Sequence, residues 1–222
     1  MPSHIILLCP LSDAVYLMTF LNLYNPGLVI KVAPDKATLE AHLASSPADV
    51  RLIGFCTPVI VPAETLARLA GPAYNIHPAS HEYPGKYPAE FAFYDHAKRF
   101  GATAHEMAAQ VDTGPIVGAI CTDAPPIANL PWFLHVGKQA AVRLFFSMAP
   151  AFATSPAPLE RLPLAWGDRR CGQKDLDALC ALPSDIDEGE LERRIAAFSQ
   201  IPGARFHTLF RGRRFDLAPQ SP

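Results

Sequence analysis

Short apolar runs alternate with longer segments of helical spacing from the N-terminus to residue 77. Continuous apolar runs are typical of buried parallel strands, and they predict strands at 4–9, 28–32, 51–56 and 73–77. The segments between them predict helices at 13–24, 35–45 and 62–71. The resulting β-α-β-α-β-α-β order predicts an α/β fold with a doubly wound, mostly parallel sheet.

The pattern changes over the rest of the chain. A helix is predicted at 87–100, followed by strands at 101–107 and 115–121 and a long, very apolar core helix at 132–152. From about residue 153 the sequence is rich in proline, then predicts a helix at 187–198 and a hairpin at 204–217. We therefore expect a main domain over residues 1–153 and a small C-terminal extension over 154–222.

The fourth predicted strand ends in a pair of polar side chains, in the sequence YNIHPASHEYPG at 74–85. Asn75 and His77 are two residues apart and so point to the same face of a strand. Pro78 then ends the strand ladder, because it has no N–H to donate. Open α/β sheets bind their ligands at this edge, so we expect an imidazole and a carboxamide side by side in a binding site.

Composition narrows the possible locations and partners. The chain has 222 residues, 50% of them hydrophobic, and a net charge of −2, which does not indicate a nucleic-acid-binding surface. No apolar stretch reaches membrane-spanning length, and the N-terminus lacks the basic region of a signal peptide. The five cysteines are odd in number, and three of them lie in apolar runs, which predicts reduced thiols. We therefore expect a cytoplasmic protein without a membrane or nucleic-acid partner.

A third polar residue, Asp112, lies in the loop sequence QVDTGPIV. Taken singly, Asp112 is consistent with a turn cap, His77 with a core histidine and Asn75 with a strand end. Taken together, they form a catalytic set, since a nearby carboxylate raises the pKa of an imidazole. An imidazolium and a carboxamide then donate two hydrogen bonds to one developing oxyanion. The sequence has no GxSxG motif, so this set suits attack on a carbonyl by a nucleophile that the protein does not supply.

These residues carry a family resemblance. The segments NIHP, YPG and GATAHEMAAQVDTGPIV occur in order between residues 75 and 117 and resemble the core of the folate-dependent formyltransferases. The preceding GFCTPVIVPAETLARL resembles the family segment that borders the pterin. The resemblance covers residues 50–150 well and residues 1–50 only in pattern. It implies a Rossmann-like formyltransferase fold, with the catalytic domain at 1–153.

The resemblance also implies a mechanism. An amine attacks the formyl carbon of 10-formyltetrahydrofolate, while His77, as imidazolium, and Asn75 stabilise the oxyanion. Asp112 would keep His77 charged and would relay the amine proton through water. His105 matches a recurrent family histidine, to which we assign an accessory role. Backbone groups of two loops are expected to contact the pterin: Thr57, Pro58, Val59 and Ile60 in one, and Ala109, Gln110 and Val111 in the other.

One loop departs from the family pattern. HPASHEYPG is a residue shorter than the usual family loop and lacks its second proline, which brings His81 and Glu82 close to His77 in sequence. Contact with the acceptor, by these two residues together with Ser80 and Lys86, is one interpretation, and a solvated loop is another. A zinc site at His77, His81 and Glu82 lacks a clear further ligand, so we expect no metal.

Sequence features argue against two of the acceptors that the family uses and favour a third. CPLSDAVYL, after the first predicted strand, lacks the glycines that bind the substrate phosphate in glycinamide ribonucleotide formyltransferases. About 70 residues follow the last long helix, which is short for the basic barrel of methionyl-tRNA formyltransferases. The tail LERRIAAFSQIPGARFHTLFRGRRFDL instead resembles the end of sugar-nucleotide N-formyltransferases, where such elements join subunits. We therefore expect an amino-sugar nucleotide or similar small amine as acceptor, and a homodimer formed through the C-terminal extension.

Two other functions stay open. A hydrolase of 10-formyltetrahydrofolate would use water as the acceptor. That branch of the family carries an N-terminal regulatory domain, whereas this chain begins directly with the predicted sheet. A catalytically silent folate- or nucleotide-binding relative would keep the fold alone. The presence of Asn75, His77 and Asp112 together argues against the silent protein.

Overall fold

The computed structural model describes residues 1–169 and 171–217, so Arg170 and the last five residues of the expected C-terminal extension lie outside it. Its elements follow in chain order: β1 (His4–Leu8), α1 (Leu11–Tyr24), β2 (Val29–Ala33), α2 (Lys36–Ala44), β3 (Arg51–Phe55), α3 (Ala63–Leu66), β4 (Tyr74–His77), α4 (Pro88–Tyr94), β5 (Arg99–Glu106), β6 (Ile116–Asp123), α5 (Leu130–Thr154), α6 (Gln173–Cys180), β7 (Ala181–Leu182), α7 (Glu188–Phe198), β8 (His207–Phe210) and β9 (Arg213–Asp216).

The main sheet has six strands in the order β2-β1-β3-β4-β5-β6. The first four strands of that order pair in parallel, while β5 and β6 join antiparallel to their neighbours. The predicted α/β class with a mostly parallel sheet is therefore confirmed. Because β3 and β4 run parallel, the segments that follow Phe55 and His77 leave the sheet at the same edge.

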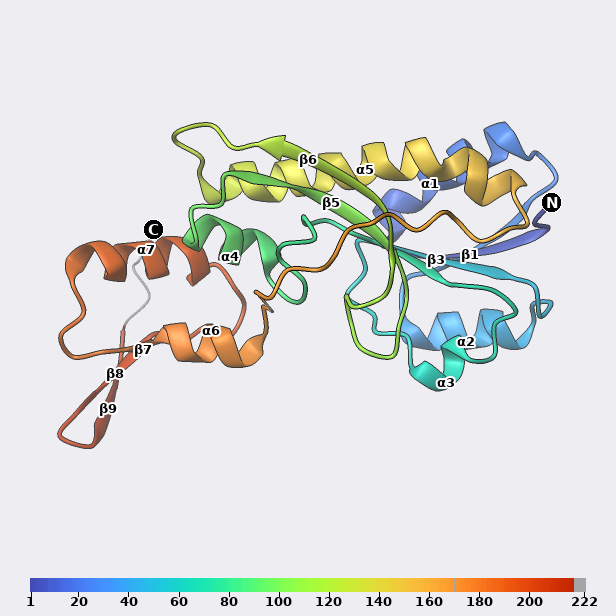
Figure 1. Ribbon diagram of the computed structural model, residues 1–222. Helices are drawn as coiled ribbons and strands as arrows, with labels where there is room; N and C mark the ends of the chain where they lie inside the picture. The colour runs from blue at the N-terminus through green and yellow to red at the C-terminus, as the bar shows by residue number, and fades with distance from the viewer. Residues whose placement is uncertain (170, 218–222) are drawn as a thin grey trace.

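Helices cover both faces of this sheet. Figure 1 shows α1 and α5 on one face and α2 and α3 on the other. Phe145 and Phe152 of α5 are fully buried against Phe55 and Tyr74, so the apolar helix forms core as its composition predicts. Within the described ranges, no helix is long and apolar enough to cross a membrane.

The helix predicted at 87–100 is shorter in the structure. It ends at Tyr94, and β5 begins at Arg99. His96 has a left-handed backbone (φ 52°), and the Ala97 N–H donates to the Ala92 carbonyl at 2.9 Å, which is a Schellman ending without a glycine. The missing glycine explains why the sequence pattern predicts a longer helix.

A second difference lies in the C-terminal part of the chain, where α6 and β7 precede the predicted helix. Only Leu176 and Cys180 of α6 are buried, so this eight-residue helix buries just two side chains against the rest of the protein. Both side chains pack in one apolar cluster with Phe198 of α7. This helix therefore depends on a tertiary contact that its own sequence does not reveal.

The proline-rich segment between α5 and α6, residues 155–171, is here called the connector. Arg161 forms a two-pronged ion pair with Glu106 of β5, at 2.9 and 2.8 Å. The Leu162 N–H donates to the Ile116 carbonyl at 2.7 Å, at the start of β6. These bonds tie the connector to β5, which carries His105, and to the start of β6 (Figure 1).

One acid joins the C-terminal extension to the rest of the protein. Glu190 of α7 accepts hydrogen bonds from the Tyr94 hydroxyl of α4 and from Arg194 Nε, both at 2.6 Å, and it pairs with Arg193. Burial raises the pKa of Glu190, but the bonds from Tyr94, Arg194 and Arg193 outweigh burial and lower this pKa to about 2. Glu190 is therefore ionised throughout the physiological range.

We predict that Glu190→Gln lowers the free energy of unfolding by about 1–3 kcal/mol at pH 7, because it removes the acceptor of a phenol and two guanidinium groups. A depressed folded-state pKa stabilises the protein above the ordinary pKa, and that stabilisation is lost as the pH falls toward 2. The difference between wild type and variant should therefore shrink on acidification below 4.5. Urea unfolding at several pH values measures it, with the exposed Glu192→Gln on the same helix as control. Equal stability of the Glu190 variant and wild type at pH 7 would refute this prediction.

Candidate active site

A cavity of about 370 Å³ opens at the edge of the sheet where β3 and β4 end. Its wall combines the loop after β3, the end of β4, Gly85 and Lys86 of the next loop, and the loop between β5 and β6. Asn75, His77 and Asp112 all line it. This volume lies within the usual range of small-molecule and cofactor pockets.

Strand pairing brings the polar side chains together. In the sheet register Asn75 lies opposite His105 of β5 and beside Gly54 of β3. The Asn75 Nδ2 and His105 Nε2 atoms are 3.2 Å apart. A Cβ at Gly54 would lie 2.6 Å from Asn75 Oδ1, so a side chain there would displace the carboxamide.

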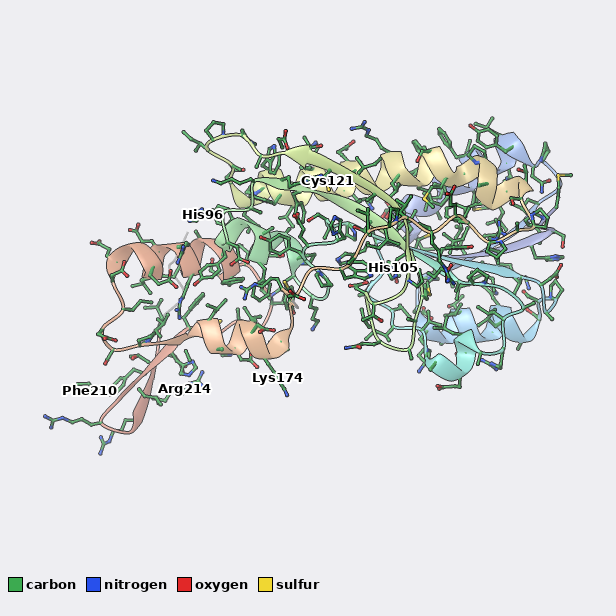
Figure 2. All side chains as sticks on the ribbon, viewed as in Figure 1. His96, His105, Cys121, Lys174, Phe210 and Arg214 are labelled. Carbon is green, nitrogen blue, oxygen red and sulfur yellow. The ribbon has the colours of Figure 1, made fainter. Side chains whose placement is uncertain are left out.

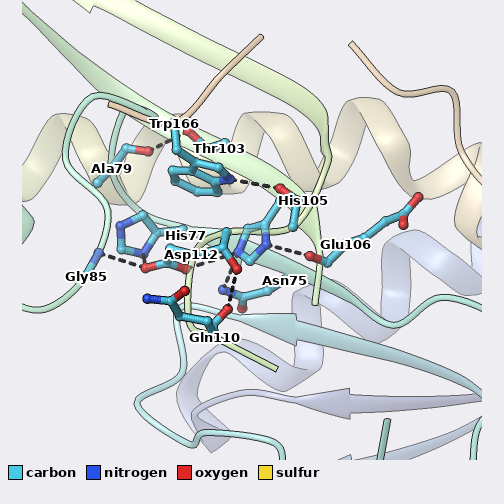
Figure 3. Close-up of polar contacts among 12 residues, drawn as sticks. Asn75, His77, Ala79, Gly85, Thr103, His105, Glu106, Gln110, Asp112 and Trp166 are labelled. Atoms are coloured by element: carbon cyan, nitrogen blue, oxygen red, sulfur yellow. Dashed lines mark hydrogen bonds and ion pairs between the residues drawn. The ribbon is translucent and has the colours of Figure 1, made fainter. Parts of the chain in front are cut away.

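Asp112 lies between two imidazoles (Figure 3). Its Oδ1 is 3.2 Å from His105 Nε2, and its Oδ2 is 3.7 Å from His77 Nδ1. The Gly85 N–H donates to the same Oδ2 at 2.9 Å. Burial raises the pKa of Asp112, but these partners together outweigh it and hold the pKa below its ordinary value. Asp112 is therefore a buried carboxylate with a partner on each oxygen.

The hydrogen bonds of His105 make it the closer histidine partner of the Asp112 carboxylate. His105 Nδ1 lies 2.8 Å from the Glu106 carbonyl, which only accepts, so Nδ1 carries a proton. His105 Nε2 faces the Asp112 carboxylate, a contact that is favourable when Nε2 carries a proton as well. His105 is therefore the imidazole closer to this carboxylate, and both of its ring nitrogens lie within reach of an oxygen acceptor.

His77 differs from the expectation based on sequence. Burial is the largest influence on its pKa and lowers it below the ordinary value, although Asp112 and the Tyr83 carbonyl act in the opposite direction. His77 Nε2 lies 3.3 Å from that carbonyl and so carries the proton of the neutral ring. The expectation that Asp112 keeps His77 protonated is thus wrong, because desolvation outweighs a carboxylate at 3.7 Å.

One polar group of the Asn75 carboxamide makes no hydrogen bond within the part of the chain that the structure describes. One end lies against His105, while the other end, Oδ1, is buried without a hydrogen-bond partner among the described residues. Exchanging the amide O and N would place the oxygen against His105 Nε2 and leave the NH₂ unused. In either orientation a buried polar group at the cavity has spare hydrogen-bonding capacity, which is unusual unless a ligand uses it.

Most residues expected to contact the pterin line this cavity: Thr57, Pro58, Val59, Ile60, Gln110 and Val111. Ala109 does not, although Ala108 and Gln110 on either side of it do.

Of the residues suspected to bind the acceptor, Lys86 lines the cavity, whereas Ser80, His81 and Glu82 do not; His105, expected to be accessory, also lines it. Ser80 is fully buried, and its hydroxyl donates to Glu82 at 3.4 Å. The His81 carbonyl accepts the Gly167 N–H of the connector at 2.8 Å. The shortened loop is therefore tied to the connector.

Metal-ligating side chains do not gather elsewhere either. Across residues 1–169 and 171–217, no group of three or more such side chains lies close enough to hold an ion.

Trp166 of the connector is a residue near the site that the sequence analysis missed. Its indole N–H donates to the Gly114 carbonyl at 2.8 Å. Its ring lies edge-to-face with His105, with centroids 5.0 Å apart, and with His77 at 6.3 Å (Figure 3). The sequence feature that could have pointed to Trp166 is a large aromatic residue in a proline-rich segment, LPLAWGD, where no core position is predicted.

This chain resembles known proteins more clearly in structure than in sequence. The sequence matches no protein-family model and no curated protein. Among solved structures, a sugar N-formyltransferase from Shewanella sp FDAARGOS_354 matches with a TM-score of 0.73, 17% identity and coverage of 96% of each chain. A 4-N formyltransferase from Francisella tularensis matches at a TM-score of 0.65 and 14% identity, covering 98% of this chain and 97% of its own.

A third solved structure contains ligands. This is an N-formyltransferase from Helicobacter canadensis in complex with folinic acid and dTDP-3-aminofucose, with a TM-score of 0.61 and 13% identity. The match covers 89% of this chain and 81% of the other. The similarity extends over nearly the whole chain, through the main sheet and the C-terminal extension, and the expected resemblance is confirmed at the level of structure. This chain therefore has the formyltransferase fold.

Proposed function

We propose that this protein is an N-formyltransferase that moves the formyl group of 10-formyltetrahydrofolate to the amine of an amino-sugar nucleotide or a similar small molecule. The observation that carries the proposal is the buried cluster of Asn75, His77 and Asp112 at a cavity of cofactor size. The Helicobacter neighbour, in complex with folinic acid and an amino-sugar nucleotide, supports this choice of donor and acceptor. The proposal requires no metal.

Asn75 and His77 divide the chemistry of this reaction. As the amine nitrogen bonds to the formyl carbon, the carbonyl electron pair moves onto the oxygen, and the Asn75 amide donates a hydrogen bond to that charge. His77 is neutral at rest, so it accepts the proton that the amine nitrogen must lose. Asp112 stabilises the imidazolium formed, and His77 then returns the proton to the departing folate nitrogen as the C–N bond breaks.

The remaining cavity residues hold the two reactants. The loop 57–60 and residues 110–111 line the cavity and offer backbone groups to the pterin. Lys86 places an ammonium group at the same cavity, where it suits a phosphate of the acceptor. His105, in contact with both Asn75 and Asp112, orients the two groups rather than reacting itself.

We predict that His77→Ala and Asn75→Ala each lower kcat by about one hundred- to one thousand-fold, because each removes a group that acts only in the transition state. The dissociation constant for the reduced folate should change little. Formylation of a panel of amino-sugar nucleotides measures this effect, and Glu192→Gln, exposed on α7 outside the cavity, is the control. Near-normal kcat in both alanine variants would refute the mechanism. Rapid formate release by wild type without any amine would instead identify a hydrolase.

The protonation state of His77 predicts a pH profile. Because the neutral imidazole is the active form and burial lowers its pKa, kcat/KM for the folate should be flat at neutral pH. It should then fall on acidification with a midpoint below 6.5. Asp112→Asn removes the charge that raises this pKa, so its midpoint should move lower still. Rates measured from pH 5 to 9 at saturating acceptor test this, and a rate that increases on acidification would show that the imidazolium is the active form.

We also propose a homodimer formed through the C-terminal extension. Strands β8 and β9 form a hairpin at the edge of the small sheet, and Phe210 and Phe215 are 58% and 52% exposed on it. Figure 2 shows Phe210 near the tip of this hairpin, away from the main sheet. An exposed apolar edge strand is a surface that a second copy would cover.

Sedimentation velocity tests the dimer. We expect wild type to have twice the 24.1 kDa mass of the chain, and the double variant Phe210→Glu, Phe215→Glu to sediment as a folded monomer. Leu23→Glu, a comparable exposed apolar position on α1, should leave the dimer intact. A monomeric wild type at micromolar concentration would contradict the proposal.

A further inference from the structure

The connector is bonded to the same loop that bounds the cavity. Its Gly167 N–H donates to the His81 carbonyl, and its Cys171 N–H donates to the Pro84 carbonyl at 2.9 Å. The Lys86 N–H donates back to the Cys171 carbonyl at 2.8 Å. Through these bonds, the segment that leads to the C-terminal extension holds the loop between β4 and α4 along its length (Figure 1).

Two glycines show how closely the connector and the loop approach. A Cβ at Gly85, whose φ is 109°, would lie 2.1 Å from the Cys171 carbonyl oxygen. A Cβ at Gly167 would lie 2.6 Å from the Glu82 carbonyl oxygen. Only a residue without a side chain fits at either position. The Gly85 N–H also donates to Asp112 Oδ2. Gly85 therefore connects the Asp112 carboxylate to the loop residues on either side of it, which are hydrogen-bonded to Cys171.

Trp166 lies at the centre of this segment and covers the histidines. Its indole N–H is fixed on the Gly114 carbonyl, two residues after Asp112 in the chain. From that position its ring meets the His105 ring at 85° and the His77 ring at 64°. Edge-to-face contacts of this kind fix ring orientation. The charged and titratable groups that act on His77 are Asp112 and His105, and Trp166 adds an apolar wall beside them.

We propose that Trp166 is a positioning residue of the active site: it holds the His77 and His105 rings on Asp112 and excludes water from the three. The connector up to Cys171 is then part of the catalytic unit rather than a link to the extension. The effect of Trp166 on turnover rests on the function proposed above, whereas its effect on the histidines is a property of the unliganded protein.

Two variants and one control test this proposal. Trp166→Ala removes both the ring and the apolar wall, whereas Trp166→Leu keeps apolar volume and removes the ring and its N–H. Trp132→Leu is the matched control, because Trp132 is half-buried on α5 and packs on Phe133 away from the cavity. Circular dichroism establishes that each variant is folded. NMR titration of isotope-labelled histidines measures the protonation of His77 and His105 without any substrate.

Water that enters at Trp166 relieves the desolvation of His77, so we expect Trp166→Ala to raise the His77 pKa toward its ordinary value. The acidic limb of the kcat/KM profile should move to higher pH with it. We expect kcat to fall about tenfold or more with KM for the folate little changed, because displaced catalytic groups reduce rate more than binding. The His77 pKa and the kcat of Trp166→Leu should lie between those of wild type and Trp166→Ala. Both quantities should be the same in Trp132→Leu as in wild type.

The outcomes separate the two proposals. Histidine resonances and titrations that stay as in wild type in the folded Trp166→Leu variant would overturn the positioning role, whether or not Trp166→Ala folds. A wild type that formylates no amine would refute the proposed function. Altered histidine titration in the Trp166 variants would still support the positioning role in that case.

Discussion

The site depends on one buried carboxylate shared by two imidazoles. Asp112 has almost no access to solvent, and its two oxygens face His105 and His77. A buried carboxylate is stable only when it is paired and hydrogen-bonded, and His105 at 3.2 Å and the Gly85 amide at 2.9 Å are the close partners of Asp112. Its left-handed backbone (φ 48°) is a strained conformation for a residue other than glycine, which the surrounding contacts must maintain.

Distance and burial assign different states to the two histidines. His105 lies 3.2 Å from Asp112 Oδ1 and is the natural partner of its charge. His77 is 3.7 Å from Oδ2, and burial dominates its pKa. A positive charge at His77 would lose its hydration in this buried position, and Asp112 at 3.7 Å offsets that cost only in part. The cluster therefore rests with a neutral base at His77, next to a carboxylate that can stabilise the proton once His77 accepts it.

The connector links this chemistry to the rest of the chain. Arg161 pairs with Glu106, next to His105, and Trp166 covers the histidines. Beyond Cys171, the extension is anchored on α4 through Phe198 and Glu190. The elements from α6 onward extend away from the main sheet and leave β8 and β9 largely exposed (Figures 1 and 2). One segment of proline-rich sequence thus contacts the site, while the part that follows it presents an exposed apolar surface.

The sequence by itself determined the sheet, its helical layers and the place of Asn75 and His77, because apolar runs and the period of two in strands are local properties. The sequence also identified the loop motif around Asp112. Only the tertiary structure decided that His77 is neutral, since burial is a sum over the whole fold. The same holds for Trp166, which reaches the histidines from 61 residues beyond His105 through contacts that no local pattern encodes.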